Sequence, residues 1–250
     1  MRGLAAHELL EILDQGEDLS PAGRAALLLT VACSDYPRER VKSLSIGERD
    51  ALLAQIRART FGGTVESVVT CPACRELVEV SLDVRSVFPD RTQAAPSEET
   101  AREPLLIASG DFVVQAAVPA VRDVETIVTT DNPAEGLRRL LRRCILRAEH
   151  RGEPCEADDL PEDVRALIDS RIAEADPQGD VQLAIQCSGC EHHWAEVFDI
   201  LSFFWNEMQT AARRLLREIH VLASAYGWTE SEILTLSTRR RRIYLEMVGG

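Results

Sequence analysis

CPACRELVEV at residues 71–80 and CSGCEHHWAEVF at residues 187–198 each place a Cys-x-x-Cys turn directly before a run of strand-forming residues. A spacing of two residues lets both thiolates of one turn reach a metal ion at about 2.3 Å with tetrahedral angles. Two such turns complete a four-thiolate shell with no open position, which is typical of structural zinc sites. The sequence therefore predicts one structural Zn²⁺ bound by Cys71, Cys74, Cys187 and Cys190.

Two alternatives stay open for these turns. Each could be an independent redox pair, although neither turn begins a helix after a strand as a thioredoxin-like unit requires. His192 or His193 could replace one cysteine, although we expect both histidines and Trp194 on the following strand. The other three of the seven cysteines are not predicted ligands, because Cys33 and Cys144 fall in apolar helical patterns and Cys155 in a polar loop.

The two cysteine segments also resemble each other outside the cysteines. A shift of 116 residues lays residues 65–88 over residues 181–204 without a gap. The identical positions are Val65, Cys71, Cys74, Asp83, Ser86 and Phe88, which fall on Val181, Cys187, Cys190, Asp199, Ser202 and Phe204. The match suggests two equivalent half-sites that face each other.

The first sixty residues show the apolar spacing of helices. Ser20 and Pro21 predict an N-cap and a first helical residue, and SIGE at residues 45–48 predicts a capping box. The helix that this box opens should end at Gly62. From Thr64 the apolar period becomes that of a strand, so the residues on either side of the first cysteine turn should form a β-hairpin.

The middle of the chain is polar before it becomes structured again. Residues 90–104 contain two prolines and predict a flexible linker. We then expect a strand at residues 111–119, a helix at 133–150, a loop at 151–159 and a helix at 160–175.

A helix predicted at residues 201–226 carries apolar residues alternately four and three apart, which is a heptad pattern. This apolar row consists of Leu201, Trp205, Met208, Ala212, Leu215, Ile219, Leu222 and Tyr226. About three heptads is close to the minimum for a coiled coil, so packing within the chain and partner binding both stay open. For partner binding we single out Trp205, Met208, Leu215 and Ile219.

Two short helices should follow Gly227, capped by Thr229 and Ser237. The last begins with four consecutive arginines: Arg239, Arg240, Arg241 and Arg242. Three helices joined by tight turns superficially resemble a helix-turn-helix, which binds nucleic acid. Consecutive arginines point around the whole helix, however, so we expect this cluster to contact an acidic protein partner.

The composition narrows the function further. A net charge of −13 disfavours broad nucleic-acid binding. The longest apolar run, AALLLTVAC, is too short to span a membrane, and the N-terminus lacks the pattern of a signal peptide, so we expect a cytoplasmic protein. The chain contains no Gly-rich phosphate loop, His-Glu-x-x-His or Gly-x-Ser-x-Gly motif, which disfavours an enzyme with a small-molecule substrate.

The segments CPACRELVEVSLDV, CSGCEHHWAEVFDILSFFWNEM and HVLASAYGW…EIL…RRRR.YLE resemble the baseplate hub assembly chaperone family of contractile-tail phages. They are closer still to the versions in phage-tail-like contractile injection systems of bacteria. The resemblance extends from about Gly3 to the C-terminus and is weak through the linker and the central helices. It implies a non-enzymatic role in assembling or completing the baseplate hub, with hub or spike proteins as partners. The only family features that the resemblance transfers to this chain are the four cysteines and the C-terminal helical surface. Whether the protein stays in the finished particle is left open.

Together these features predict an α+β, mainly α-helical fold, in which helical N- and C-terminal parts surround a zinc-ribbon-like pair of β-hairpins. The expected order is a helical region (1–62), a knuckle hairpin (63–89), the linker (90–104), an α/β insertion (105–180), a second hairpin (181–199) and a helical region (200–250). The predicted function is a zinc-stabilised assembly factor or structural component of the baseplate hub. The alternative is a zinc-ribbon regulator that binds nucleic acid through the C-terminal arginines.

Overall fold

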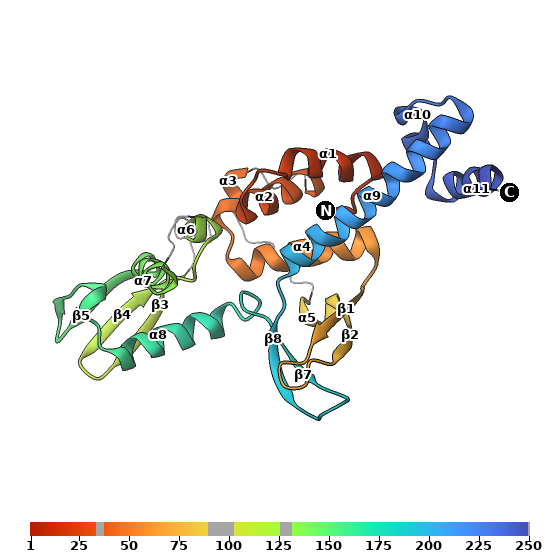
Figure 1. Ribbon diagram of the computed structural model, residues 1–250. Helices are drawn as coiled ribbons and strands as arrows, with labels where there is room; N and C mark the ends of the chain where they lie inside the picture. The colour runs from red at the N-terminus through yellow and green to blue at the C-terminus, as the bar shows by residue number, and fades with distance from the viewer. Residues whose placement is uncertain (34–37, 90–102, 126–131, 250) are drawn as a thin grey trace.

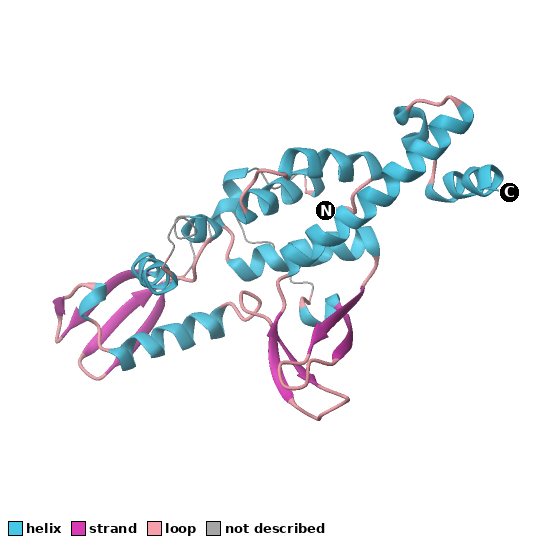
Figure 2. Cartoon of the chain, in the orientation of Figure 1, coloured by secondary structure: helices cyan, strands magenta, loops and turns pink. Residues whose placement is uncertain are grey.

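The computed structural model describes residues 1–33, 38–89, 103–125 and 132–249. Its helices form an elongated central bundle with an α/β unit at one end and two short helices at the other, while two β-hairpins project from one side (Figures 1 and 2). The fold is mainly helical with small antiparallel sheets, so the predicted α+β class is confirmed. No helix in the described ranges is long and apolar enough to cross a membrane.

Two of the four N-terminal helices begin at the caps that the sequence indicates, and one of them ends at the expected glycine. Ser20 accepts the N–H of Gly23, and Ser45 forms the capping box with Glu48. Gly62, with φ of 104°, ends the fourth helix in a conformation that residues with a side chain rarely adopt. The helices are α1 (Ala6–Gly16), α2 (Pro21–Ala32), α3 (Arg38–Ser43) and α4 (Ile46–Phe61).

The long helix α9 (Ile200–Tyr226) contributes to two separate cores. Large apolar side chains of its first half, such as Phe204 and Met208, are fully buried in the core with α1, α2 and α4. Each such large apolar side chain stabilises the fold by about 1.5–3 kcal/mol. The second half packs against α10 (Glu230–Thr235) and α11 (Thr238–Gly249).

The apolar row of α9 is therefore covered by the chain itself. All its members from Leu201 to Leu222 are buried, and only Tyr226, at 37% exposure, reaches the surface. Gly227 ends the helix with φ of 69°, as expected. Of the two alternatives for this row, the structure shows packing within the chain.

Each hairpin consists of two antiparallel strands joined by a cysteine turn. The first pairs β1 (Thr64–Thr70) with β2 (Leu77–Asp83) and leads into the short helix α5 (Val84–Val87). The second pairs β7 (Gln182–Gln186) with β8 (His193–Val197) and leads into α9. Each hairpin thus ends where a helix of the main bundle begins.

The α/β unit is a four-stranded antiparallel sheet whose strands follow one another in chain order. One face packs against α8 (Glu162–Ala175), where Ile107, Val114 and Ile168 are buried. The strands are β3 (Leu105–Ser109), β4 (Phe112–Ala116), β5 (Ile145–His150) and β6 (Glu153–Pro154). The remaining elements are α6 (Val121–Glu125), α7 (Pro133–Cys144) and the 3₁₀ turn η1 (Ala157–Asp159).

The predicted helix at residues 133–150 is wrong in its last third. α7 ends at Cys144, and Ile145–His150 form β5 between β4 and β6. Helix propensity is a weak preference, and here the backbone hydrogen bonds with β4 outweigh it. The strand β3 was not anticipated, and β6 lies inside the predicted loop. Of the predicted linker, residues 90–102 lie outside the described ranges.

Candidate metal centre

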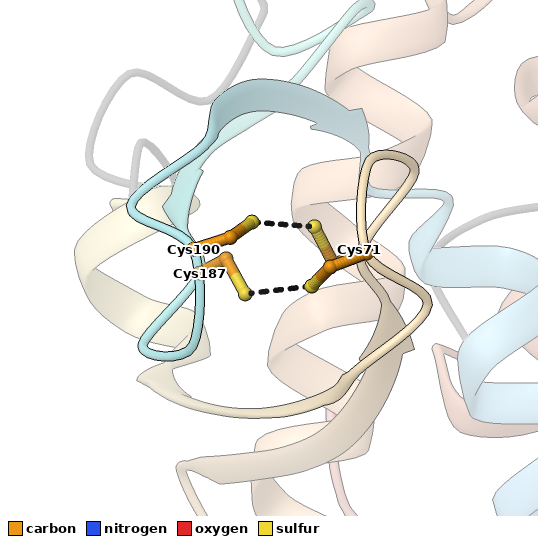
Figure 3. Close-up of side chains that lie close together, drawn as sticks. Cys71, Cys187 and Cys190 are labelled. Carbon is orange, nitrogen blue, oxygen red and sulfur yellow. Dashed lines mark hydrogen bonds between the residues drawn. The ribbon is translucent and has the colours of Figure 1, made fainter.

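The four cysteines of the two turns meet between the hairpins. The sulfur of Cys71 lies 3.7 Å from that of Cys190, and the sulfur of Cys74 lies 3.6 Å from that of Cys187. Figure 3 shows Cys71 on one turn opposite Cys187 and Cys190 on the other. All four sulfurs lie within 4.8 Å of one another. In a tetrahedral site with metal–sulfur distances of about 2.3 Å, the sulfurs are about 3.8 Å apart. The cluster therefore has the size of a shell around one metal ion.

The first turn is closed by backbone hydrogen bonds around Cys71. The N–H of Cys71 donates to the carbonyl of Glu76 at 2.8 Å, and the N–H of Arg75 donates to the carbonyl of Cys71 at 3.0 Å. Arg75 has φ of 67°, a left-handed conformation that costs about 1–2 kcal/mol for a residue with a side chain. The turn keeps this strained residue directly after Cys74, where the chain must reverse.

The second turn repeats the first, 116 residues later. The backbone N–H of Cys187 donates to the carbonyl of His192 at 2.9 Å, and the N–H of Glu191 donates to the carbonyl of Cys187 at 3.0 Å. Glu191 has φ of 58°, like Arg75 in the first turn. The donor, the acceptor and the left-handed residue of the second turn each lie 116 residues after their counterparts in the first turn. The expected equivalence of the two half-sites is therefore confirmed in the backbone.

The equivalence continues into the helices that follow. Asp83 accepts the N–H of Arg85 and caps α5, and Asp199 accepts the N–H of Ser202 and caps α9. Phe88 and Phe204, at equivalent positions, are both buried in the core of the bundle. The cysteine cluster is thus connected through two short strands to the start of two packed helices.

Without a cation, the pKa values of Cys71, Cys74 and Cys190 are shifted by their neighbours. The backbone N–H of Cys74 lowers the pKa of Cys71 to about 7. The N–H of Glu76 lowers the pKa of Cys74, but Cys190, burial and the other two thiols outweigh it and raise that pKa to about 12. One thiolate is favoured and further thiolates are disfavoured beside it, a cost that a bound cation removes. The donor set therefore fits a soft metal ion.

The two alternatives for the turns find less support. Within the described ranges, only the four cysteines form a metal-sized cluster, so neither histidine joins it. His193 and Trp194 lie on β8, as expected, whereas His192 directly precedes the strand and stacks on Trp194. Both turns join strands rather than beginning helices, which disfavours thioredoxin-like redox pairs.

The other cysteines lie away from this cluster. Cys33 and Cys144 are buried, as the helical patterns predict. Cys155 is half-buried and packs against the core beneath α8.

The residues singled out for partner binding divide into buried and exposed groups. Trp205, Met208, Leu215 and Ile219 are all buried in the chain's own cores, and of the four only Leu215 lines an open groove. Among the arginines, Arg239, Arg240 and Arg242 are exposed. Arg241 is buried, because successive residues of a helix point about 100° apart; it donates to the carbonyl of Leu236 at 2.8 Å.

Sequence reasoning missed an ion pair close to the hairpins between a buried arginine and a partly buried glutamate. Arg57 of α4 is 2% exposed and donates to both carboxylate oxygens of Glu207 on α9, at 2.8 and 2.7 Å. It also donates to the carbonyl of Gly62 at 2.7 Å. The two partners lie 150 residues apart, so no local pattern signals their contact.

A family model described as T4 bacteriophage base plate protein matches residues 8–205. The match includes the N-terminal helices, both hairpins and all four clustered cysteines, and it ends within the first turns of α9. Comparisons with curated proteins and with solved structures gave no match.

Proposed function

The chain belongs to the T4 bacteriophage base plate protein family, and on this basis we propose that it is a non-enzymatic, zinc-stabilised assembly factor or structural component of the baseplate hub. It would serve a phage tail or a contractile injection system and bind hub or spike proteins. Its assembly work would take place in the cytoplasm, where thiols stay reduced and available to a metal.

The observation that carries this proposal is the four-cysteine cluster between two hairpins that each lead into the helical bundle. A closed thiolate shell leaves no position for a substrate, so its metal would stabilise structure rather than catalyse. A metal there would hold the starts of α5 and α9 at a constant separation. The helical surfaces would then have a constant shape for an assembly partner.

Zinc is the proposed ion because it prefers tetrahedral thiolate shells and imposes no redox chemistry. Elemental analysis of protein purified without chelator should find about one zinc per chain. Iron is the main competitor for four thiolates, and an iron–thiolate absorption band with no zinc would contradict the zinc proposal. Cys155→Ser, outside the cluster, should leave the metal content unchanged.

The hub role can be tested by co-purification. A tagged chain, expressed in cells that are assembling particles, should capture a hub or spike protein identified by mass spectrometry. Capture of no baseplate component would contradict the proposal. Mass spectrometry of purified particles would then distinguish a retained subunit from a transient chaperone.

The nucleic-acid alternative depends on the arginines of α11. Only three of the four are exposed, and the chain carries a net charge of −13. Binding of a labelled DNA duplex, measured across a salt series, tests it. Phosphate contacts would produce a steep salt dependence that Arg239→Gln/Arg240→Gln weakens.

A further inference from the structure

A groove of about 1140 Å³ follows α9 between the helical bundle and the C-terminal helices. Its walls come from the start of the chain and α1, the end of α4, strand β1, α9 and α11. In Figure 1, β1 and α11 flank the same side of α9. The groove therefore joins the bundle, the first hairpin and the C-terminal pair in one surface.

The bottom of the groove is apolar. Leu9 and Leu215 are buried there, and Phe203 and Ala211 are half-buried. Phe61, at 37% exposure, adds an aromatic ring at the edge. A partner side chain that enters the groove would therefore meet apolar surface.

The rim of the groove is basic. Arg213 and Arg217 of α9 and Arg242 of α11 are exposed, and none has an ion-pair partner among the described residues. Three carboxylates line the groove: Glu207 is engaged by Arg57, Glu218 is engaged by Arg214 and Arg241, and Glu66 is exposed and offsets only one of the three unpaired arginine charges. The groove thus presents unpaired positive charge on a chain whose net charge is −13.

The size and chemistry of the groove indicate its ligand. Pockets for small molecules occupy about 300–1,000 Å³ and enclose most of the ligand, whereas this groove is larger and open along a helix. An apolar bottom with a basic rim complements a peptide that carries apolar anchors and acidic flanks. Nucleic acid fits less well, because phosphates would meet the apolar bottom and an acidic remainder of the chain.

We infer that this groove binds an acidic, amphipathic segment of another baseplate protein, an inference that rests on the proposed function. The arginines of the rim attract and orient the segment, and the apolar bottom holds its anchors. Glu66 and Ser67 of β1 form part of one wall, so the hairpin that carries Cys71 and Cys74 also shapes the groove. The binding surface thus shares only Leu215 with the apolar row and otherwise lies on the side of α9 that faces β1 and α11.

Charge reversal tests the groove against a matched control. Arg213→Glu/Arg217→Glu reverses two charges of the rim, and Arg85→Glu/Arg122→Glu reverses two exposed arginines of other helices, outside the groove. Because like charges across an interface repel strongly, the rim variant should capture roughly tenfold less of the baseplate partner than the wild type. The control should capture nearly as much as the wild type. Circular dichroism checks that both variants stay folded.

The outcomes separate this inference from the proposed function. Equal capture by both variants overturns the groove and leaves the hub role intact, whereas no baseplate capture by the wild type rejects both. If light scattering shows a dimer that the rim variant loses, the groove binds a second copy and the inference is wrong. If the wild type binds a labelled DNA duplex and the rim variant does not, the groove binds nucleic acid and the inference is also wrong.

A photo-crosslinker identifies the occupant directly. Benzoylphenylalanine introduced at Ala211, on the bottom of the groove, should link to a partner peptide rich in Asp and Glu with apolar residues between them. The adduct should disappear in the rim variant. A linked peptide with net positive charge would overturn the inference.

Discussion

Asp50 is a buried carboxylate that makes the stability of the helical core depend on pH. It is 8% exposed and accepts a hydrogen bond from Arg49 at 2.7 Å. Burial raises the pKa of Asp50 to about 6, Arg49 opposes the shift, and Asp199 and Asp176 add to it. An unfolded Asp has a pKa of about 3.9, so between the two values the folded chain keeps a proton that the unfolded chain releases. The stability from this group is present below about pH 4 and is lost as the pH rises through about 6.

We expect Asp50→Asn to stabilise the protein by about 1–3 kcal/mol near pH 7.5 and hardly at all near pH 4, because the amide needs no charge desolvation. Urea unfolding of both proteins at the two pH values measures the difference. The difference between variant and wild type removes the contributions of other carboxylates to the pH dependence. One of these is Glu8, whose pKa is lowered to about 2 by its hydrogen bond with Arg2. An equal difference at both pH values would contradict this account of Asp50.

The ion pair of Arg57 and Glu207 predicts a second effect. Glu207→Gln leaves Arg57 buried without its counter-charge and should lower the free energy of unfolding by about 2–4 kcal/mol. The control Glu66→Gln, at an exposed carboxylate, should change it by less than about 0.5 kcal/mol. The double variant Arg57→Met/Glu207→Leu should regain part of the loss, because it leaves no buried charge. Chemical denaturation of the three variants provides the measurement.

α9 is the element that connects the separate parts of the bundle. Its Asp199 cap follows the second hairpin, its first half packs in the main core, and its second half holds α10 and α11. The two halves share one apolar face because residues four and three apart fall on the same side of a helix. α2 and α4 cover the first half and α10 and α11 cover the second, while α1 contacts both, so the ends of the face should respond separately to mutation.

We expect Leu222→Ala, in the second half, to cost about 2–5 kcal/mol locally, because it leaves a cavity beneath α10 and α11. Hydrogen exchange should rise in residues 228–249 and change little in α1, α2 and α4. Leu216→Ala provides the control, since Leu216 is 49% exposed on the other side of the same helix. Uniformly faster exchange through all helices would show that α9 unfolds as one unit.

A metal bound by the four cysteines would act on the whole molecule, because these cysteines come from distant parts of the chain. Cys74 and Cys187 lie 113 residues apart, and closing a loop of that length costs about 4 kcal/mol in chain entropy. Zinc binding to small thiolate peptides contributes on the order of 10 kcal/mol, which outweighs that cost. The central unit with β3–β6 and α8 lies within this closed loop.

Removal of the metal by a chelator should therefore lower Tm and speed hydrogen exchange in both hairpins. Cys74→Ser and Cys190→Ser, one in each turn, should lose metal and destabilise the protein by similar amounts, because the half-sites are equivalent. Cys155→Ser should behave as the wild type. A chelator that leaves Tm and hairpin exchange unchanged would contradict a structural metal.

Much of the local structure could be predicted from the residues themselves. The cysteine turns, the caps at Ser20, Ser45 and Thr229, and the end of α4 at Gly62 all appear where the sequence places them. The 116-residue shift also predicts the matching hydrogen bonds of the two turns. Each of these features depends on groups within a few residues of one another.

Other features required the tertiary structure. The heptad spacing predicts an apolar face on α9 but not the helices that cover it, and Ile145–His150 become a strand only because β4 lies beside them. The pairing of Arg57 with Glu207, the burial of Arg241 and the basic groove likewise join elements that are distant in sequence. Hydrogen bonds and dihedral preferences determine turns and caps from neighbouring residues, whereas which faces meet depends on the packing of the whole chain, which no local periodicity specifies.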